Sequence, residues 1–591
     1  MKRITLKPYL GITVALLFIV STPVSAKNGQ NIPYEVWGVD QSNSVSSAPA
    51  RGTIGSLIWV WNSEDIHAQV TNGTPAQPLG CDGNNTPGDG PCDLLDVFPG
   101  TLAEHDSNGV TGAFLGDYNY GRLHGALSDP QNRYMNISLF GPGNGFVGIL
   151  NGMTKEAVAL FRVTGTNSGQ RVHMSFWNSD GSALLIANLD GKVLERIDIS
   201  RNADGAITQA SFNRSASLGV GKNLAVTAEV KMYLGQNAHG NAMLGTITGD
   251  YSNADFGDLT PAGKCRENGC SGGSDGNMGG RVNNVIICPI SSSNDRAYIT
   301  MGGGGLLVAD TTTTPMTIVG EYGQQVINGA GCGGVQVGNH MWLNAGVSAS
   351  DAGNVHSTFT IYTLNDDAFH TVQAENTPLP VTVYKDSDAN DGHAANTATI
   401  GNLDGDPSPN LTGQLPGTST RRDSHGMTRT LSSNHVHTVD RIQNLVEAID
   451  TQTLARTTYD LTSTNGLGNG VGPCDAASVT YENGSTGDPS LPSNDAAPDL
   501  METTPDGKYL AVALRGPIPV SVTHAAQGSC PGVGIIRLLA GGKSGKLATV
   551  LRTTNTVDDT PVSAPGGYPY AGAEHSDIHG ASVRTRVEDM R

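Results

Sequence analysis

Four histidines stand just before segments with the pattern of a β-strand, and they are the residues of this chain best suited to metal chemistry. They are His124, His173, His425 and His579. Neutral imidazole nitrogens are good ligands for copper, zinc, iron or nickel. If the fold brings equivalent strand starts together, the four rings predict a site for copper or another transition metal.

Two of these histidines share the pattern Asp-x-His-Gly, at Asp423–Gly426 and Asp577–Gly580. A carboxylate that accepts the second ring N–H can fix the tautomer of a metal-binding histidine. We therefore expect Asp423 and Asp577 to orient the histidines that follow them. The alternative is structural: each histidine braces its strand through a hydrogen bond to a loop, and the glycine leaves room for the backbone.

Two weaker candidates for metal binding occur elsewhere. His435 and His437 are two residues apart, so both rings would share one face of a strand, although a half-exposed strand face is the favoured interpretation. Asp386, Asp388 and Asn390 have the alternating spacing of a calcium loop. Because this segment lacks the Gly and the bidentate Glu of the EF-hand pattern, an acidic surface loop is favoured and calcium is the alternative.

The elements that would position these residues follow one repeated theme of strand, turn, strand, turn, strand. The segment 173–199, HMSFWNSDGSALLIANLDGKVLERIDI, shows it with two Asp-Gly turns. Other copies span 124–163, 285–322, 425–461 and 499–551, and weaker copies span 34–62 and 331–364. Repeats of about 40 to 50 residues with several strands each are typical of a β-propeller. We expect an all-β, seven-bladed propeller, with eight blades as the alternative.

A propeller would explain how histidines far apart in the sequence could meet. Blades are arranged radially, so the first strands of different blades lie beside one central channel. The segment His579–Arg586 is predicted to be a strand that closes the ring with N-terminal residues. Residues 215–280 and 365–422 do not fit a blade and are predicted to be two long loop insertions. Helical periodicity with capping signals is missing from every long stretch of the sequence.

The N-terminus has the features of a secretory signal peptide. Residues 1–7 carry three positive charges, residues 9–20 are mainly apolar, and Val24-Ser25-Ala26 has small residues at the cleavage spacing. We expect cleavage after Ala26, leaving one propeller domain of residues 27–591 that is secreted or periplasmic. Later apolar runs are shorter than the about 20 residues of a membrane span, so we expect none.

The chain is strongly acidic, with a formal net charge of −19 that becomes −22 when the three cations of the signal peptide are removed. Nucleic acids and anionic membranes attract basic patches, so neither is an expected partner. The expected partner is a small-molecule substrate or another exported protein. The sequence does not determine the substrate or the number of subunits.

Eight cysteines in an exported chain favour disulfides over metal thiolates. Two pairs would each close a short loop, Cys81 with Cys92 and Cys265 with Cys270. The remaining pairs would join neighbouring segments, Cys288 with Cys332 and Cys474 with Cys530. Eight cysteines allow 105 pairings, so the long-range pairs stay open to alternatives.

The blade motifs resemble those of a known group of propellers. SDGSALLIANLDGKVLERI, HVHTVDRIQNLVEAIDTQTL and TPDGKYLAVALRG look like repeats of the YVTN/lactonase-like superfamily. More distantly, the histidines at the blade starts resemble those of exported copper propellers of the nitrous-oxide reductase, thiocyanate dehydrogenase and methanethiol oxidase types. That second resemblance implies metal ligation for His124, His173, His425 and His579. The dense histidine clusters of nitrous-oxide reductase and a cupredoxin-like tail are missing here.

Three functions remain from these observations. The favoured one is an exported, metal-dependent oxidoreductase that acts on a small molecule, with copper as the preferred metal. The first alternative is a non-catalytic propeller that binds a ligand or a protein, in which the histidines are structural. The second alternative is a lactonase-like, metal-assisted hydrolase.

Overall fold

Nearly all regular structure in the protein is β-strand. The computed structural model describes residues 32–41, 57–118, 122–141, 144–221, 224–251, 284–293, 295–302, 304–323, 326–327, 329–346, 359–369, 379–386, 422–441, 443–470, 472–474, 495–516, 528–554 and 576–590. The α-helices within these ranges are α1 (Ser63–Asn72) and α2 (Leu94–Val97). Asn62 caps α1 by accepting a hydrogen bond from the backbone N–H of Asp65 at 2.8 Å, and Gly73 ends it with a φ of 78°.

Four sheets consist of four antiparallel strands each. The first contains β34 (Ile578–Thr585), β1 (Tyr34–Asp40), β2 (Leu57–Asn62) and β3 (Cys92–Asp93). The second contains β22 (Gly334–Val337), β23 (His340–Ala345), β24 (Thr360–Asn365) and β25 (Val381–Lys385). The third contains β26 (Ser424–Arg429), β27 (His435–Asp440), β28 (Leu445–Asp450) and β29 (Arg456–Asp460). The fourth contains β30 (Pro498–Thr503), β31 (Tyr509–Leu514), β32 (Gly532–Leu539) and β33 (Ser544–Arg552).

Two larger sheets have extra strands. One contains β6 (Arg122–Ser128), β7 (Tyr134–Gly141), β8 (Asn144–Asn151) and β9 (Ala157–Arg162), followed by β17 (Lys231–Leu234), β4 (Ala103–Asp106) and β5 (Gly109–Phe114). The other contains β11 (Val172–Trp177), β12 (Ala183–Asn188), β13 (Val193–Arg201), β14 (Ile207–Asn213), β18 (Thr246–Thr248) and β15 (Leu218–Gly219). β10 (Gly165–Thr166) and β16 (Val226–Ala228) form a separate two-stranded sheet.

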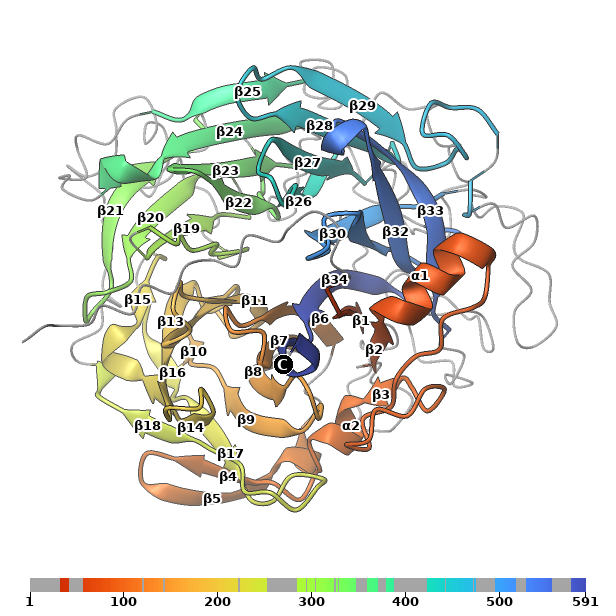
Figure 1. Ribbon diagram of the computed structural model, residues 1–591. Helices are drawn as coiled ribbons and strands as arrows, with labels where there is room; N and C mark the ends of the chain where they lie inside the picture. Colours follow the sequence, from red (N-terminus) through yellow and green to blue (C-terminus); the bar gives the residue numbers. More distant parts are fainter. Residues whose placement is uncertain are drawn as a thin grey trace, which may run out of the picture. The chain divides into compact units, whose positions relative to one another are not determined.

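The sheets are the blades of a β-propeller, and their first strands lie nearest the common centre (Figure 1). The core lies between the blades: Ile58 of β2 belongs to one apolar cluster with Leu139 of β7, and Val36 of β1 belongs to another with Ile535 of β32. As predicted, the C-terminal strand β34 closes the ring, because it pairs along its length with the N-terminal strand β1.

The predicted number of blades is wrong: six sheets have four or more strands, where seven or eight complete blades were expected. A three-stranded sheet of β19 (Arg296–Thr300), β20 (Leu306–Asp310) and β21 (Thr317–Tyr322) lies beside them. Residues 285–290 run along β19 as an irregular segment, with isolated bridges from Val285 to Met301 and from Ile290 to Ala297 and with backbone hydrogen bonds between them. Pro289 in this segment has no N–H to donate, which explains why a regular strand does not form.

Both ranges that the sequence suggested to be loop insertions contain strands. In the first range, β17 pairs with β4 and β9, and β18 runs parallel to β14, so these residues extend two blades. In the second range, β25 is the outer strand of its blade because it pairs with β24. The predicted remainders, 252–283 and 387–421, lie outside the described residues. Among the helices that the structure describes, none is long and apolar enough to cross a membrane.

Candidate functional site

Five innermost strands each carry one ionisable side chain at the same structural position, a β-bulge. On β6, for example, Leu123 pairs with Leu139 and Gly125 pairs with Ser138, so the register passes over His124. The same interruption of the register occurs on β11, β26, β30 and β34. The residues at these five bulges are His124, His173, His425, Asp499 and His579. A bulge turns a side chain out of its regular strand direction, and here the five bulges bring one cluster together.

The four histidine rings lie close to one another. The ring centre of His124 is 3.7 Å from that of His579 and 4.0 Å from that of His173. The ring centre of His579 is 6.3 Å from those of His173 and His425. All four side chains are buried, with at most 6% of each residue exposed. The four histidines singled out in the sequence therefore meet in space, and their role as metal ligands stays a prediction.

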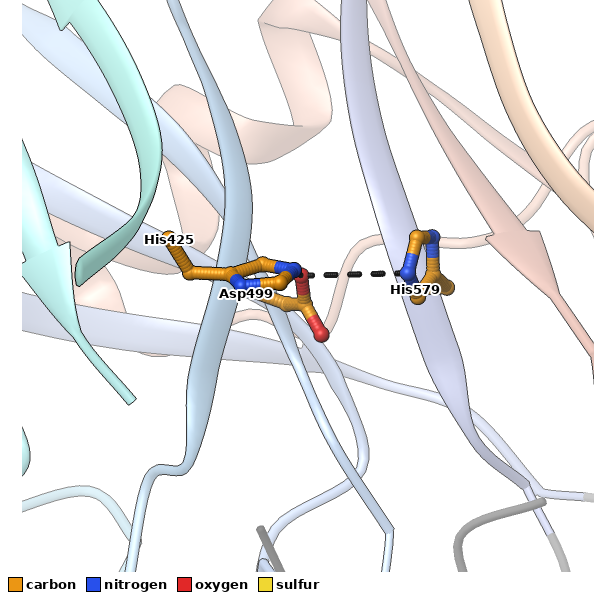
Figure 2. Close-up of side chains that lie close together, drawn as sticks. All are labelled: His425, Asp499 and His579. Carbon is orange, nitrogen blue, oxygen red and sulfur yellow. Dashed lines mark ion pairs between the residues drawn. The ribbon is translucent and has the colours of Figure 1, made fainter. Parts of the chain in front are cut away.

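Asp499 lies between His425 and His579 (Figure 2). Its Oδ1 is 3.0 Å from Nε2 of His425 and 3.9 Å from Nε2 of His579. One ligand atom from each of these three residues lies within 4.8 Å of the others. Two imidazole nitrogens and a carboxylate oxygen at this spacing could hold a transition-metal ion.

A backbone carbonyl fixes the tautomer of His579. Nδ1 of His579 lies 2.6 Å from the carbonyl oxygen of His124, and a carbonyl can only accept a hydrogen bond, so Nδ1 carries the proton. In the neutral ring, Nε2 then has the free lone pair and faces Asp499. Metal-binding histidines commonly have this arrangement, in which the ring N–H away from the metal donates to a carbonyl or carboxylate oxygen.

Asp423 and Asp577 each bind a buried arginine, and their role in orienting the histidines stays a prediction. Arg441 donates to Asp423 from Nε at 2.9 Å, and Arg515 donates to both oxygens of Asp577 at 2.6 and 2.8 Å. The same two arginines also bind Oδ2 of Asp499, at 3.4 and 2.8 Å. The five side chains are buried and alternate in charge, so the aspartates neutralise arginines that would otherwise be unpaired charges.

The environment gives the cluster an uneven set of charges. Burial lowers the pKa of His579 to about 3 and holds the pKa of His124 and His173 well below the usual range, helped by neighbouring histidines. Burial and Arg441 also disfavour the cation of His425, but Asp499 outweighs them and raises its pKa to about 10. Despite burial, His425 and His579 keep the pKa of Asp499 well below its usual range. Three rings are therefore neutral lone-pair donors.

Two buried nitrogen atoms of the cluster lack a hydrogen-bond partner within the described part of the chain. They are Nδ1 of His124 and Nδ1 of His173. A buried polar atom without a partner costs about 1–3 kcal/mol. The residues whose ligand atoms lie close enough together to hold one ion are His425, Asp499 and His579, and the rings of His124 and His173 border this group.

The glycines of the His-Gly pairs allow the inner strands to approach. A Cβ atom at Gly426 would collide with the carbonyl oxygen of Asp499 on β30. At Gly125 it would collide with the Met174 sulfur on β11. In the Asp-x-His-Gly motif, the aspartate and the glycine therefore have structural roles. The histidine points into the cluster.

The weaker candidates have other partners. Nδ1 of His437 lies 3.0 Å from the Tyr459 hydroxyl and Nε2 lies 2.8 Å from the carbonyl oxygen of Gly542, so neither nitrogen is left for a metal shared with His435. This finding corrects the His435–His437 metal site.

Of the three predicted calcium ligands, Asp386 lies within the described residues. Asp386 pairs with Arg422 at 2.9 Å, which neutralises the carboxylate that would begin a calcium loop. Asp388 and Asn390 lie outside the described residues.

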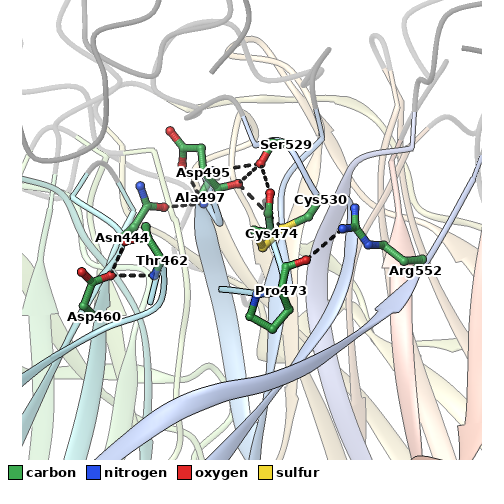
Figure 3. The surroundings of a disulfide bond; sticks show 10 residues. All are labelled: Asn444, Asp460, Thr462, Pro473, Cys474, Asp495, Ala497, Ser529, Cys530 and Arg552. Atoms are coloured by element: carbon green, nitrogen blue, oxygen red, sulfur yellow. Dashed lines mark hydrogen bonds between the residues drawn. A yellow bond between two sulfur atoms is a disulfide. The ribbon is translucent and has the colours of Figure 1, made fainter. Parts of the chain in front are cut away.

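Two of the four predicted disulfides are present, Cys81–Cys92 and Cys474–Cys530. Figure 3 shows how the surroundings of the second bond are tied together: the Ser529 hydroxyl donates to the carbonyl oxygens of Cys474 and Asp495, at 2.8 and 3.0 Å.

The predicted Cys288–Cys332 bond is wrong, because both residues are free and buried. They belong to different apolar clusters, with Cys288 between two blades and Cys332 beside Met174. Cys265 and Cys270 lie outside the described residues.

Asp499 was missed because it is not a histidine, yet a signal for it was present. Ser424 on β26 and Pro498 on β30 both face the last residue of the next strand, and Met427 and Met501 both resume the pairing. Aligning SHGM with PDLM places Asp499 at the position of His425. The match between these two short segments becomes visible only when the strand pairing of the two blades is aligned.

The chain has distant similarity to solved structures. No family model matches the chain, and no curated protein matches it. Solved structures similar to it include a Lactobacillus plantarum protein (8% identity, 94% of this chain and 99% of that chain, TM-score 0.41). Others are the periplasmic gluconolactonase of Pseudomonas aeruginosa (8%, 88% and 98%, TM-score 0.39) and hydrazine synthase of Kuenenia stuttgartiensis (11%, 70% and 76%, TM-score 0.33). Lactonase-like propellers are thus among the structural neighbours, and at these TM-scores they carry no argument about function.

Proposed function

We propose that the five bulge residues form a transition-metal centre, with copper preferred, in an exported propeller oxidoreductase that acts on a small molecule. The observation that carries this proposal is the pair of buried, unpartnered Nδ1 atoms of His124 and His173 beside the His425–Asp499–His579 group. In a purely structural cluster, these nitrogens would be expected to have hydrogen-bond partners.

The two oxygens of Asp499 have different neighbours. Arg441 and Arg515 engage Oδ2 of Asp499, while Oδ1 faces the two histidines. The arginines therefore hold the carboxylate through Oδ2, and a bound ion would displace the proton that pairs His425 with Oδ1. A bound metal would supply Lewis-acid or redox chemistry at this point.

The proposal is tested by elemental analysis of protein purified without chelator. We expect near-stoichiometric copper or another transition metal in the wild type and its loss in a His425→Ala/His579→Ala double variant. His437→Ala is the matched control, because His437 is a buried histidine whose two nitrogens are bonded elsewhere. Metal absent from the wild type, or retained in the double variant, would contradict the proposal and favour the non-catalytic binding propeller.

The same experiment separates the two enzymatic possibilities. Metal that is redox-active and coloured supports the oxidoreductase, since a redox ion changes its oxidation state with substrate. A redox-silent metal together with ester or lactone cleavage supports the metal-assisted hydrolase. Both would use the same ligands, so the metal must be identified before substrates are screened.

Export is part of the proposal. The two disulfides fit an oxidising compartment, and the N-terminal sequence has the features of a signal peptide. N-terminal sequencing of exported protein is expected to begin at Lys27. A mature chain that begins at Met1 would contradict cleavage.

A further inference from the structure

A cavity of about 200 Å³ adjoins the histidine cluster. Its lining includes residues that directly follow the bulges on the inner strands, such as Met174 after His173, Leu500 after Asp499 and Gly580 after His579. Because successive residues of a strand are about 3.3 Å apart, the cavity begins within a few ångströms of the cluster. It is smaller than the about 300–1,000 Å³ typical for drug-sized ligands, so it suits a small molecule.

The wall of the cavity is mostly apolar. Side chains that supply apolar surface include Leu127, Met174, Phe176, Ile287, Met427 and Met501. Two hydroxyl groups in the wall already have protein partners: Ser582 donates to the carbonyl oxygen of Ala126, and Thr428 lies 3.0 Å from the Thr503 hydroxyl. These hydroxyls therefore link neighbouring inner strands and are not the main polar groups for binding a ligand.

Glu502 is the only carboxylate among the described residues that line this cavity, and no lysine or arginine of that part of the chain lines it. Its Oε2 accepts a hydrogen bond from the backbone N–H of Val583 at 2.8 Å, which leaves the carboxylate with further acceptor capacity. Burial raises the pKa of Glu502 to about 7, although the bond from Val583 opposes the shift. A carboxylate in an apolar wall is stabilised by a cation that pairs with it.

We propose that the cavity binds a small organic cation, with its apolar body against the methionine, leucine and isoleucine side chains and its ammonium group against Glu502. Phe176 in the same wall can add attraction between its ring face and the cation. The net charge of −19 raises the local concentration of cations around the protein. This inference rests on the proposed metal centre only in taking the bound cation to be its substrate.

The test compares three probes of equal length, n-butylammonium, butan-1-ol and butyrate, by calorimetry. For the wild type we expect butylammonium to bind tightest and butyrate weakest. Glu502→Gln is expected to weaken butylammonium binding at least tenfold, and Glu502→Asp, which keeps the charge, to retain the preference for the ammonium. Glu195→Gln is the control, because burial likewise raises the pKa of Glu195 to about 7, but Glu195 does not line the cavity.

Several results would overturn the inference: no binding of butylammonium, equal binding of the three probes, or butylammonium binding that Glu502→Gln leaves unchanged. If Glu502→Gln fails to fold, the ranking of the probes on wild type and Glu502→Asp decides. Metal content is measured on every sample. Full metal without cation binding overturns this inference alone, whereas cation binding without metal overturns the metal centre alone.

Discussion

Buried histidines occur in two regions of this propeller and are treated differently. In the blade of β26–β29, the ring of His437 bonds through both nitrogens, to Tyr459 and Gly542. At the centre of the ring, His124 and His173 each keep one buried nitrogen without a partner among the described residues. A satisfied histidine stabilises its fold, whereas an unsatisfied one destabilises it. The blade histidine thus serves the structure, whereas the two central histidines have nitrogens that the proposed metal could use.

The charged residues around the central cluster sharpen this difference. Asp423 pairs with Arg441, and Asp577 pairs with Arg515. Each of these carboxylates is therefore neutralised by a buried arginine. Asp499 contacts both kinds of neighbour, since Oδ2 binds the arginines and Oδ1 faces the histidines. One oxygen of this carboxylate thus binds arginines, and the other faces the proposed metal site.

The largest expected effect follows removal of a structural charge. Arg515→Met should lower the free energy of unfolding by about 3–5 kcal/mol, because it leaves Asp577 and Asp499 as buried charges with less compensation. Urea unfolding measures this change. Arg586→Met, which breaks a pair with the exposed Glu64, should cost at most about 1 kcal/mol. Equal effects of the two substitutions would show that the buried arginine is dispensable.

The second prediction compares the two kinds of histidine directly. His437→Ala should lower the free energy of unfolding of metal-free protein by about 2–4 kcal/mol, because the Tyr459 hydroxyl and the Gly542 carbonyl lose their partner and a cavity forms. His173→Ala should cost less, since it removes a nitrogen that has no partner. A larger loss at His173 than at His437 would remove the basis of the comparison.

The third prediction concerns metal removal. Dialysis against a chelator should destabilise wild-type protein by about 2.7 kcal/mol if the metal had been present at 100 times its Kd. Thermal unfolding should show the change as a lower Tm in the wild type and no change in His425→Ala/His579→Ala. A chelator that lowers the Tm of both proteins equally would place the metal elsewhere.

The last prediction is a slope of stability against pH. Burial lowers the pKa of His437 to about 4, so below pH about 6.5 the unfolded chain takes up a proton that the folded chain refuses. Stability should therefore fall as the pH drops from about 6.5 to 4, by at most about 1.4 kcal/mol per pH unit from this residue. His437→Gln should show a shallower slope in urea unfolding over this range. An identical slope would contradict a neutral His437.

Much of the fold could be predicted from local patterns. Segments such as 173–199 and 425–461 contain the alternation and Asp-Gly turns of a blade, and both form antiparallel strands at these positions. The count of complete blades was not predictable, because one inner segment contains Pro289 and pairs irregularly with its neighbour, without forming a continuous strand. The short-range disulfide Cys81–Cys92 was predictable, whereas Cys288 and Cys332 are kept apart by the packing of separate clusters.

The sequence by itself determined which residues could meet at the centre, since His124, His173, His425 and His579 all lie near the start of a first blade strand. The tertiary structure alone decided what each of their neighbours does. Asp423 and Asp577 stand beside histidines in the sequence but face arginines in space, and Asp499 stands beside none yet joins two. The reason is that bulges and contacts between blades set the directions of side chains, and neither is encoded by spacing along one strand.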